Sequence, residues 1–400
     1  MSGDQPGTGY AGRPPGSVSP TAPPGQHRAG PTSRPALRTW IVVGVASVGF
    51  SLAALVVAVY LGAALGVQTL LLAVLLAALP LGIVIPTFLW LDRFESEPTR
   101  YLVGAFLWGA LVASALAAVF NTGAVTVFRE STDPGAALAT AAVFVAPFVE
   151  EALKAVPVLL VWLLLRAEFD GVTDGMVYAG MSAAGFAFTE NIQYLGMAYT
   201  NGGGAALGAT FVSRCLMSPF AHPMFTVLIG IGIGIAATSR SKLARVGAPL
   251  VGYAFAVLAH SLWNLAAMTG GSGLVTVYLL VEVPVFLAFV GLVVWARHHE
   301  GLLIGRYLRP YADTGWLSPG EVTMLSSMGR RREARMWARA NTGRSGLTAM
   351  REFQDTASEL ALLRRRMSHS AADAKALQGE HDLLEALVVR RRTFLGLPVA

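Results

Sequence analysis

Long runs of apolar residues constrain this chain more than any other feature of its sequence. A membrane-spanning helix needs about 20 predominantly apolar residues, and eight runs approach or exceed that length. Charged side chains occupy only 14% of the 400 positions, whereas a soluble domain usually carries charge on about a quarter of its residues. We therefore predict an all-α, polytopic transmembrane helix bundle of about eight spans. The runs cover residues 40–60, 69–90, 101–128, 139–165, 172–199, 209–237, 248–269 and 274–296.

Basic residues in the connecting segments predict how the runs cross the membrane. Lysine and arginine favour the cytoplasmic side, and here they occupy the N-terminal tail, every second loop and the region after residue 297. Eight crossings then leave both termini of a cell-membrane protein in the cytoplasm. We expect the net charge of +6 to serve topology and contact with the lipid bilayer, and we expect no nucleic-acid partner. The basic loop residues are Arg93, Arg100, Arg166, Arg240, Lys242 and Arg245.

Composition divides the chain into three regions. Residues 1–36 are rich in Pro, Gly, Ser and Thr and predict a disordered tail, in which we expect no cleavable signal peptide. Residues 37–297 hold the apolar runs and form the predicted transmembrane core. Residues 298–400 predict a small Arg-rich helical region in the cytoplasm, near anionic lipid. The single cysteine, Cys215, permits no internal disulfide.

Local signals predict the helices of the C-terminal region and one close packing contact in the core. Ser318, followed three positions later by Glu321, is the pattern of a helix start in which each side chain bonds the other residue's backbone N–H. Helical periodicity recurs over residues 349–366 and 371–392, with no catalytic constellation in the sequence there. In the core, the Gly-rich stretch 230–234 predicts close packing between helices rather than a ligand loop.

Ionisable side chains inside the apolar runs mark the predicted functional site. A charged group within a membrane span costs about 2.5 to 3.5 kcal/mol even on a lenient scale, so such residues usually serve function. Here they concentrate in the fourth to seventh runs. They are Glu150, Glu151 and Lys154 in FVEEALK, Glu190 and Asn191 in FAFTEN, Arg214 and His222 in the sixth run, and His260 and Asn264 in HSLWN.

Depth along each run predicts one shared polar cavity. With about 1.5 Å of rise per residue, Glu150 and Glu151 lie about 16 to 18 Å from the outer end of their run, and His260 lies about 18 Å from the inner end of its own. Glu190 and His222 also fall between mid-membrane and the outer leaflet. Four consecutive runs can therefore bring their acids and imidazoles together.

Helical spacing sharpens the prediction for the glutamate pair. Lys154 follows Glu151 by three positions and Glu150 by four, so it can reach both. Two adjacent carboxyl groups in a low-dielectric site do not ionise together easily, which suits a general base. The structural interpretation is that a lone histidine or asparagine only bonds a neighbouring helix and that the lysine only neutralises the glutamates. Three carboxylates, two histidines and a lysine at matching depths favour function.

Four motifs, in order along the core, resemble those of the PrsW family of membrane-embedded proteases, which are related to the CAAX prenyl endopeptidases and the bacteriocin-processing proteases. The motifs are EEALK at 150–154, FAFTEN at 186–191, FAHPMFT around His222 and HSLWN at 260–264. The loop DRFESEP at 92–98 resembles a further family feature that usually reads EPEP, from which Ser96 departs. The resemblance covers about residues 79–295.

The resemblance implies an endopeptidase that cuts a membrane-bound protein substrate within or beside the bilayer. In the family's best-known role that substrate is an anti-sigma factor. Glu150 and Glu151 match the family's essential paired glutamates, His222 and His260 match its essential histidines, and Glu190 matches its second acidic motif. The spacing of the HSLWN motif also resembles the HxxxN motif of the CAAX relatives, which helps to form an oxyanion site.

From these matches we expect a glutamate of the pair to take a proton from a water that His222 orients, while His260 and Asn264 donate hydrogen bonds to the developing oxyanion. The role of a metal stays open. Glu151, His222 and His260 could bind zinc and leave a position for water, whereas the lack of an HExxH spacing in the sequence favours a metal-free, glutamate-dependent reaction. The supporting residues are Lys154, which would set the charge state of the pair, Asn191 and Arg214.

Two other functions are compatible with a buried acidic cluster. A proton-coupled transporter also carries Glu, Lys and His within the membrane, but such carriers commonly show internal repeats, and the sequence has no such self-similarity. A non-enzymatic membrane scaffold would use the Arg-rich C-terminal region, but a degenerate protease would normally have lost one of the essential residues. Substrate-dependent flux in liposomes would support the transporter, whereas cleavage of a reporter peptide would support the protease.

Overall fold

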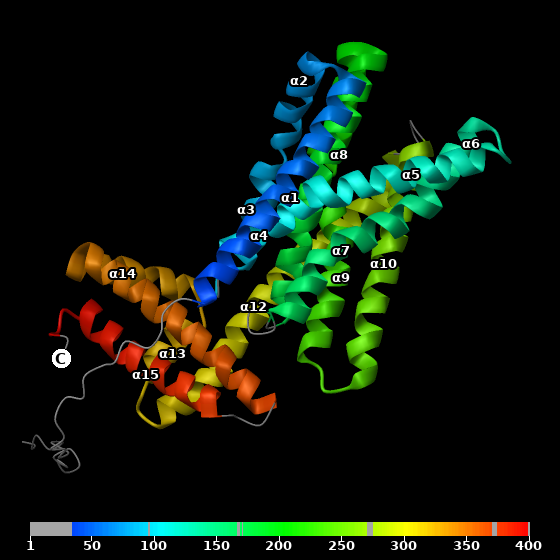
Figure 1. The fold of residues 1–400 in the computed structure, drawn as a ribbon. Coiled ribbons are helices and arrows are strands. Elements are labelled where there is room, and N and C mark those ends of the chain that lie inside the picture. Colours follow the sequence, from blue (N-terminus) through cyan, green and yellow to red (C-terminus); the bar gives the residue numbers. More distant parts are fainter. Residues whose placement is uncertain are drawn as a thin grey trace, which may run out of the picture. The chain divides into compact units, whose positions relative to one another are not determined.

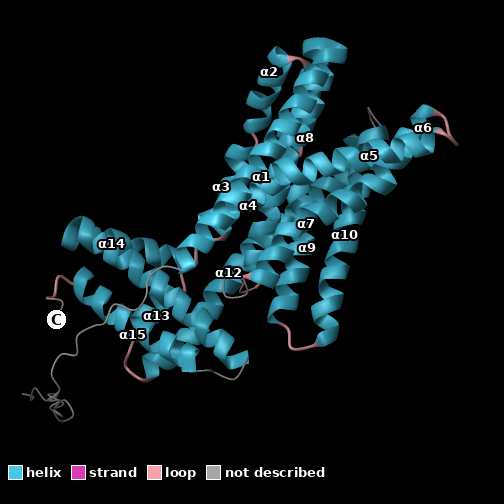
Figure 2. Ribbon diagram, viewed as in Figure 1, coloured by secondary structure: helices cyan, strands magenta, loops and turns pink. Residues whose placement is uncertain are grey.

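The computed structural model of the chain describes residues 34–94, 97–165, 169, 171–269, 275–369 and 374–398. Over these residues the chain is helical and contains no β-strand, as the all-α prediction requires (Figures 1 and 2). Most of the predicted disordered tail, as well as Glu95 and Ser96 of the DRFESEP loop, lies outside the described ranges. The chain separates into two units, Met1–Ser47 and Val48–Ala400, and the boundary between them falls within the first helix.

Short π-helical segments, labelled η, interrupt the α-helices. The following elements make up the N-terminal half and the helices of the site. They are α1 (Arg34–Leu65), α2 (Val67–Ala78), α3 (Leu81–Leu91), α4 (Thr99–Leu107), η1 (Trp108–Ala113), α5 (Ser114–Arg129), α6 (Pro134–Thr140), η2 (Ala141–Val145), α7 (Ala146–Leu164), α8 (Val172–Phe211), η3 (Val212–Met217), α9 (Ala221–Thr238) and α10 (Lys242–Thr269). The remaining elements are η4 (Tyr278–Glu282), α12 (Val283–Asp313), α13 (Pro319–Leu325), α14 (Met328–His369) and α15 (Ala374–Phe394).

Six segments of the described chain are long and apolar enough to cross a membrane, which makes this a multi-pass membrane protein. They are Gly44–Leu65, Val67–Leu91, Thr99–Arg129, Val172–Thr238, Lys242–Met268 and Val275–Asp313. The number differs from the eight predicted runs for two reasons. The run that contains α7 is not among the six, since its three charged residues lower its apolar character, and Val172–Thr238 contains two of the predicted runs.

The segment Val172–Thr238 is a helical hairpin. Gly203 has φ 64° inside α8, a left-handed conformation that glycine adopts without steric cost and that breaks a helix. Residues at nearly equal chain distances on either side of it meet in space: Arg214 contacts Asn191, and a Cβ added to Gly230 would lie only 2.1 Å from the carbonyl oxygen of Gly175. The chain therefore reverses at Gly203, and the predicted role of the Gly230–Gly234 stretch in close helix packing is confirmed.

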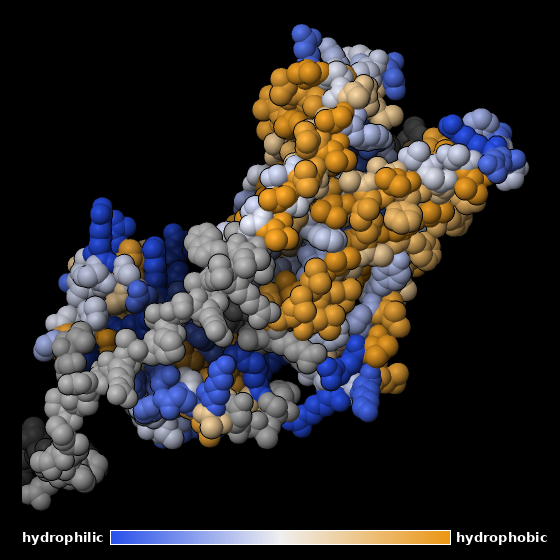
Figure 3. Space-filling model, in the orientation of Figure 1, coloured by the Kyte–Doolittle hydropathy of each residue, from blue (hydrophilic) through white to orange (hydrophobic). Residues whose placement is uncertain are grey.

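The first half of α8 lies at the centre of the bundle. Its residues from Gly175 to Phe186 are all buried, and α8 packs against α2, α3, α4, α7 and α9. A helix that is buried on every side needs apolar or small residues all round, and this stretch supplies them as GMVYAGMSAAGF. The outer surfaces of the bundle are apolar as well. On the face shown in Figure 3, hydrophobic residues cover α2, α5 and α10, as lipid contact requires.

The C-terminal helices α13, α14 and α15 form a second hydrophobic core together with the end of α12, and hydrophilic residues gather over them in Figure 3. The predicted helix start is confirmed, because Ser318 and Glu321 form the reciprocal pair of hydrogen bonds at the beginning of α13. Helices also cover residues 349–366 and most of 371–392. The predicted domain boundary at residue 297 falls inside α12, which continues without a break from the bundle into the C-terminal core.

Candidate active site

The predicted site lies on α7, α8, α9 and α10, with Arg214 on η3; α7 and α9 each pack against the other three helices (Figure 1). On α7, the side chains of Glu150, Glu151 and Lys154 are buried, with relative exposures of 5%, 0% and 0%. Lys154 Nζ lies 3.4 Å from Glu150 Oε2 and 2.9 Å from Glu151 Oε1, as their spacing on one helix predicts. A buried ammonium group thus offsets part of the large desolvation cost of two buried carboxylates.

Glu151 holds the imidazole of His260. One oxygen, Oε1, lies 3.0 Å from His260 Nδ1, and the other accepts a 2.7 Å hydrogen bond from Thr226. Because a carboxylate only accepts hydrogen bonds, we assign the ring proton to Nδ1, which leaves a lone pair on Nε2. That Nε2 lies 3.7 Å from Glu150 Oε2. The contact with Glu151 therefore turns the basic nitrogen of His260 toward Glu150.

Glu190 holds the imidazole of His222 in the same way. Its Oε2 lies 2.6 Å from His222 Nε2 and also accepts a hydrogen bond from the guanidinium of Arg214. Lys154 Nζ lies 3.1 Å from the other ring nitrogen, His222 Nδ1, and an ammonium group can only donate. We therefore assign the proton to Nε2 and the lone pair to Nδ1. Each histidine is thus anchored by one carboxylate and presents a basic nitrogen next to Lys154 or Glu150.

Aromatic side chains enclose the two imidazoles. The ring centroids of His222 and His260 are 5.0 Å apart, the ring of Phe225 stacks on His260 at 5.4 Å, and Lys154 Nζ lies 4.0 Å from the centre of the Phe186 ring. These walls restrict the rotation of both histidines and lower the local dielectric. Electrostatic interactions inside the cluster are therefore stronger than they would be in water.

The donor atoms of Glu150, His222 and His260 lie within 4.8 Å of one another. A carboxylate and two imidazoles are a donor set of catalytic zinc sites, and a carboxylate behind each imidazole is the usual orienting partner of a metal-bound histidine. By its chemistry this set fits a divalent metal, although Lys154 bonds two of the same three residues. The sequence prediction named Glu151 as the carboxylate ligand. The structure directs Glu150 there instead, because adjacent residues on a helix point about 100° apart.

The three predicted amide and guanidinium residues have different surroundings. Asn191 accepts a 2.9 Å hydrogen bond from Arg214, so both residues support Glu190, and Arg214 also lies 4.0 Å from the ring centre of Tyr194. Asn264 donates a 2.8 Å hydrogen bond to the carbonyl of Ala142 in η2. That contact ties α10 to the segment preceding α7. The oxyanion role predicted for Asn264 would require its other amide hydrogen.

Two further side chains belong to the cluster and are missing from the predicted site. Thr226 is bonded to Glu151 and lies one helical turn after His222, so its helical spacing signals the contact. Asn121 on α5 donates a 3.0 Å hydrogen bond from Nδ2 to Glu150 Oε1. Its signal is a carboxamide in a predominantly apolar run, but 29 residues separate it from Glu150. No local periodicity connects the two positions.

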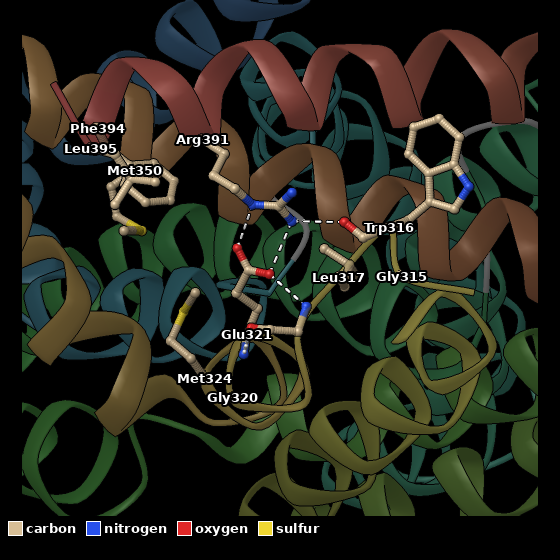
Figure 4. A pocket seen from close by; sticks show the side chains of 11 residues that line it. Gly315, Trp316, Leu317, Gly320, Glu321, Met324, Met350, Arg391, Phe394 and Leu395 are labelled. Carbon is tan, nitrogen blue, oxygen red and sulfur yellow. Dashed lines mark hydrogen bonds and ion pairs between the residues drawn. The ribbon is translucent and has the colours of Figure 1, made fainter. Parts of the chain in front are cut away.

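A separate pocket of about 600 Å³ lies in the C-terminal core (Figure 4). Glu321 projects into it from α13 and is paired with Arg391 from α15, whose Nε lies 2.6 Å from Glu321 Oε1. Arg391 also donates to the carbonyl of Trp316. The acid and base in the pocket neutralise each other and bind the backbone, which is a structural arrangement.

Comparisons with known proteins point to one family. Residues 97–289 match the model of the PrsW family intramembrane metalloprotease, and every predicted site residue lies inside that range. The chain is also similar to three curated proteins named Protease PrsW. It is 29% identical over 162 residues to the protein of Geobacillus kaustophilus (40% of this chain, 65% of the relative), and 29% identical over 175 residues to that of Bacillus subtilis (44% and 73%).

The third relative, from Clostridioides difficile, is 27% identical over 178 residues (44% of this chain, 71% of the relative). The chain thus spans about two thirds of the length of these curated relatives. No solved structure matches it. The matched range includes α4 to α10, the helices that carry the cluster, and excludes the C-terminal helices α13 to α15.

Proposed function

Because this chain belongs to the PrsW family of intramembrane proteases, we propose that it is an endopeptidase that hydrolyses a peptide bond of a membrane-bound protein substrate. One observation carries the proposal: two imidazoles, each anchored by its own carboxylate, converge with Glu150 inside a bundle of apolar helices. The anchoring carboxylates turn the basic nitrogen of His222 toward Lys154 and that of His260 toward Glu150, so that donor atoms of Glu150 and both histidines lie within 4.8 Å of one another.

We assign the general-base role to Glu150. Its Oε2 faces both the basic nitrogen of His260 and the ammonium group of Lys154, so a water between these groups would be oriented by them and deprotonated by the carboxylate. The water oxygen then attacks the scissile carbonyl carbon. When the carbon–nitrogen bond breaks, the proton held by Glu150 passes to the departing nitrogen, and the products are a carboxylic acid and an amine, between which the acid's proton then exchanges to give a carboxylate and an ammonium group.

The remaining residues position these groups and balance charge. Glu151 and Glu190 keep His260 and His222 in their tautomers. Lys154 is the cation nearest to Glu150, and we assign to it the stabilisation of the negative oxygen that forms during attack. In the prediction from sequence His260 donated to this oxygen, but Nδ1 is engaged by Glu151, so a neutral imidazole presents no second donor. A divalent metal held by Glu150, His222 and His260 would add Lewis acidity toward the carbonyl.

Substrate class and topology complete the proposal. We propose a single-span or membrane-anchored protein as the substrate, since a site inside the bundle is reached from the lipid more readily than from water. An anti-sigma factor is one such protein, and the support for it is the family resemblance alone. The basic residues in alternate loops support cytoplasmic termini and a cytoplasmic C-terminal region.

The function is tested by membrane-fragment proteomics. Cells that express the wild-type chain are compared with cells that express the Glu150→Gln, Glu151→Gln double variant at equal levels. We expect a set of membrane-protein fragments that is present with the wild type and absent with the variant, which would also identify the substrate. As the control, Glu352→Gln alters a half-exposed ion pair on α14 and should leave the fragments unchanged. Identical fragments in all three samples would contradict the proposal, and metal analysis of the purified protein tests the cofactor.

A further inference from the structure

Asn121 is a polar residue on an otherwise apolar helix face. On the face toward α7 and α8 lie Ala113, the last residue of η1, and Ala117 of α5, both buried, and Asn121 follows Ala117 by one helical turn. Its Nδ2 donates to Glu150 Oε1 at 3.0 Å. Among the described residues of α5 it is therefore the one whose side chain bonds the cluster, and it bonds the carboxylate oxygen that does not face Lys154.

The hydrogen bond to Glu150 fixes the orientation of the Asn121 amide. A carboxylate accepts hydrogen bonds, so the amide nitrogen must face it, and the amide oxygen must face away. Oδ1 is attached to the same carbon as Nδ2 and so lies within a few ångströms of Glu150. It is shielded from solvent and has no hydrogen-bond partner among the described residues. An acceptor is thus held, in a set direction, beside the carboxylate that we assign as the base.

A buried acceptor without a donor costs about 1–3 kcal/mol, and in a bilayer there is little bulk water to satisfy it. If Asn121 served only to join two helices, a side chain with a hydrogen-bond donor and no unpaired acceptor would do so at a lower free-energy cost. A hydrogen-bond donor that arrives with the substrate therefore accounts for the unpaired oxygen.

A peptide substrate must bring such donors. In an α-helix the carbonyl groups are bonded to N–H groups four residues on, so a membrane-spanning segment has to unwind locally before a water can attack one of its carbonyls. Unwinding frees backbone N–H groups in an environment where each unpaired one costs several kcal/mol. An extended peptide is commonly bound through such main-chain hydrogen bonds.

We propose that Asn121 Oδ1 is a substrate-binding group that accepts a hydrogen bond from a backbone N–H of the unwound substrate, next to the bond that is cut. The inference rests on the proposed protease function and deepens it. Asn121 then has two tasks at once: its nitrogen orients Glu150, and its oxygen places the peptide against the same carboxylate. Recognition at this point reads the backbone and is independent of the substrate's side chains.

The test is a double-mutant cycle on the full-length protein in liposomes. The probe is a synthetic single-span peptide of about 20 leucine and alanine residues with a central Gly–Ser pair, with unfolded casein in detergent as a second probe. After mass spectrometry has located the cut, peptides are made in which one backbone N–H near it is replaced by an ester oxygen, and the scissile amide itself is left intact. kcat and KM are measured for each peptide.

We expect one ester position to lower kcat/KM of the wild type about tenfold, the value of one lost hydrogen bond, chiefly through KM. In Asn121→Ala the same ester should change kcat/KM by less than about twofold, because the acceptor is already gone. Thr126→Val is the matched control, since Thr126 lies on the same helix and its hydroxyl bonds the backbone of Thr122. That variant should retain the full ester effect. Asn121→Ser, whose hydroxyl is too short to reach, replaces the alanine variant if alanine does not fold.

The outcomes separate the two proposals. Equal ester effects in the wild type and in Asn121→Ala, at every position, would overturn the role of Asn121 and leave the protease function intact. If the wild type cleaves neither the single-span peptide nor casein, the proposed function fails and this inference fails with it. A cut with a single ester position that is coupled to Asn121 supports both.

Discussion

The membrane bundle and the C-terminal core both bury charged groups, but they satisfy them differently. In the bundle, Glu150, Glu151 and Lys154 are buried against other ionisable side chains. In the C-terminal core, Arg331 has no exposed surface, and the described partners of its guanidinium are neutral: the carbonyls of Leu325 and Phe94 and the hydroxyl of Ser358. Burial lowers the pKa of Arg331 to about 10 and still leaves it charged at neutral pH.

This difference separates a structural charge from one arranged for chemistry. The guanidinium of Arg331 has its donors distributed over fixed backbone and hydroxyl acceptors, so it can stabilise only one conformation. The cluster in the bundle contains groups that exchange protons and keeps basic atoms pointing at a common place. Desolvation is costly in both regions, but only the bundle places several ionisable groups within reach of one reacting atom.

Removal of the base should have the largest effect. In Glu150→Gln the side chain keeps its size and can still bond Asn121, but it cannot take a proton from water at neutral pH. We expect kcat for the single-span peptide to fall about a thousandfold, within the range for loss of general-base catalysis. The thermal unfolding midpoint should change little. A variant that folds and keeps more than a tenth of wild-type kcat would remove Glu150 from the chemistry.

Arg331→Met tests the opposite region. The change leaves two carbonyls and a hydroxyl without their donor, so we expect α13 and α14 to lose about 3 kcal/mol of local stability, measured by hydrogen exchange with mass spectrometry. Peptide cleavage by the bundle should stay within about threefold of the wild type. The matched control is Arg390→Met, which breaks a surface ion pair with Glu352 and should cost less than about 1 kcal/mol. If kcat falls in Arg331→Met while the hydrogen-exchange protection of α13 and α14 is unchanged, the proposed distinction between the two regions is wrong.

Glu190→Gln should have an intermediate effect. Glutamine still accepts a hydrogen bond from His222, but without the negative charge the imidazole is held less firmly and its basicity falls. Loss of such an orienting carboxylate typically costs about 10–100-fold, and we expect kcat/KM to fall by that amount. In the Arg214→Gln, Glu190→Gln double variant, the loss of kcat/KM should be smaller than the product of the two single losses, because both changes disturb one network. Fully multiplicative losses would show that Arg214 acts elsewhere.

The smallest expected effect is the pH dependence of the free energy of unfolding that arises from Asp92, at the end of α3. Burial raises the pKa of Asp92 to about 8, so between about pH 4 and 8 the folded state keeps a proton that the unfolded state releases. The free energy of unfolding therefore falls as pH rises through this window. Asp92→Asn, which cannot titrate and can still accept the Glu97 N–H, should flatten that dependence. An unchanged pH profile of thermal unfolding would contradict the assignment.

The sequence predicts the bundle well because membrane insertion leaves a strong local signal. Long apolar runs need no tertiary information, and the depth of each ionisable residue follows from counting along a helix. That counting predicts the acids on α7 and α8 at the level of the histidines on α9 and α10, and the structure brings these side chains into contact.

Other features depend on rotation and on contacts between distant segments, which counting along one helix does not supply. Depth cannot distinguish Glu150 from Glu151, because the rotation of α7 decides which of them faces the basic nitrogen of His260. The bond between Asn121 and Glu150 joins two helices and has no periodic signal. The HSLWN spacing predicts Asn264 as an oxyanion donor, but its amide nitrogen donates to a carbonyl in the π-helical segment η2. A π-helix has no simple sequence pattern.

The central claim is that water trapped by Glu150, His222 and His260 cuts a peptide bond inside the bundle. The most direct measurement is mass spectrometry of the single-span peptide after incubation with reconstituted protein in water enriched in oxygen-18. We predict that the new carboxyl terminus of the N-terminal fragment carries one oxygen from the solvent, and that no fragment forms with Glu150→Gln. Absence of cleavage by the wild type, or equal labelled product from the wild type and Glu150→Gln, would contradict the account.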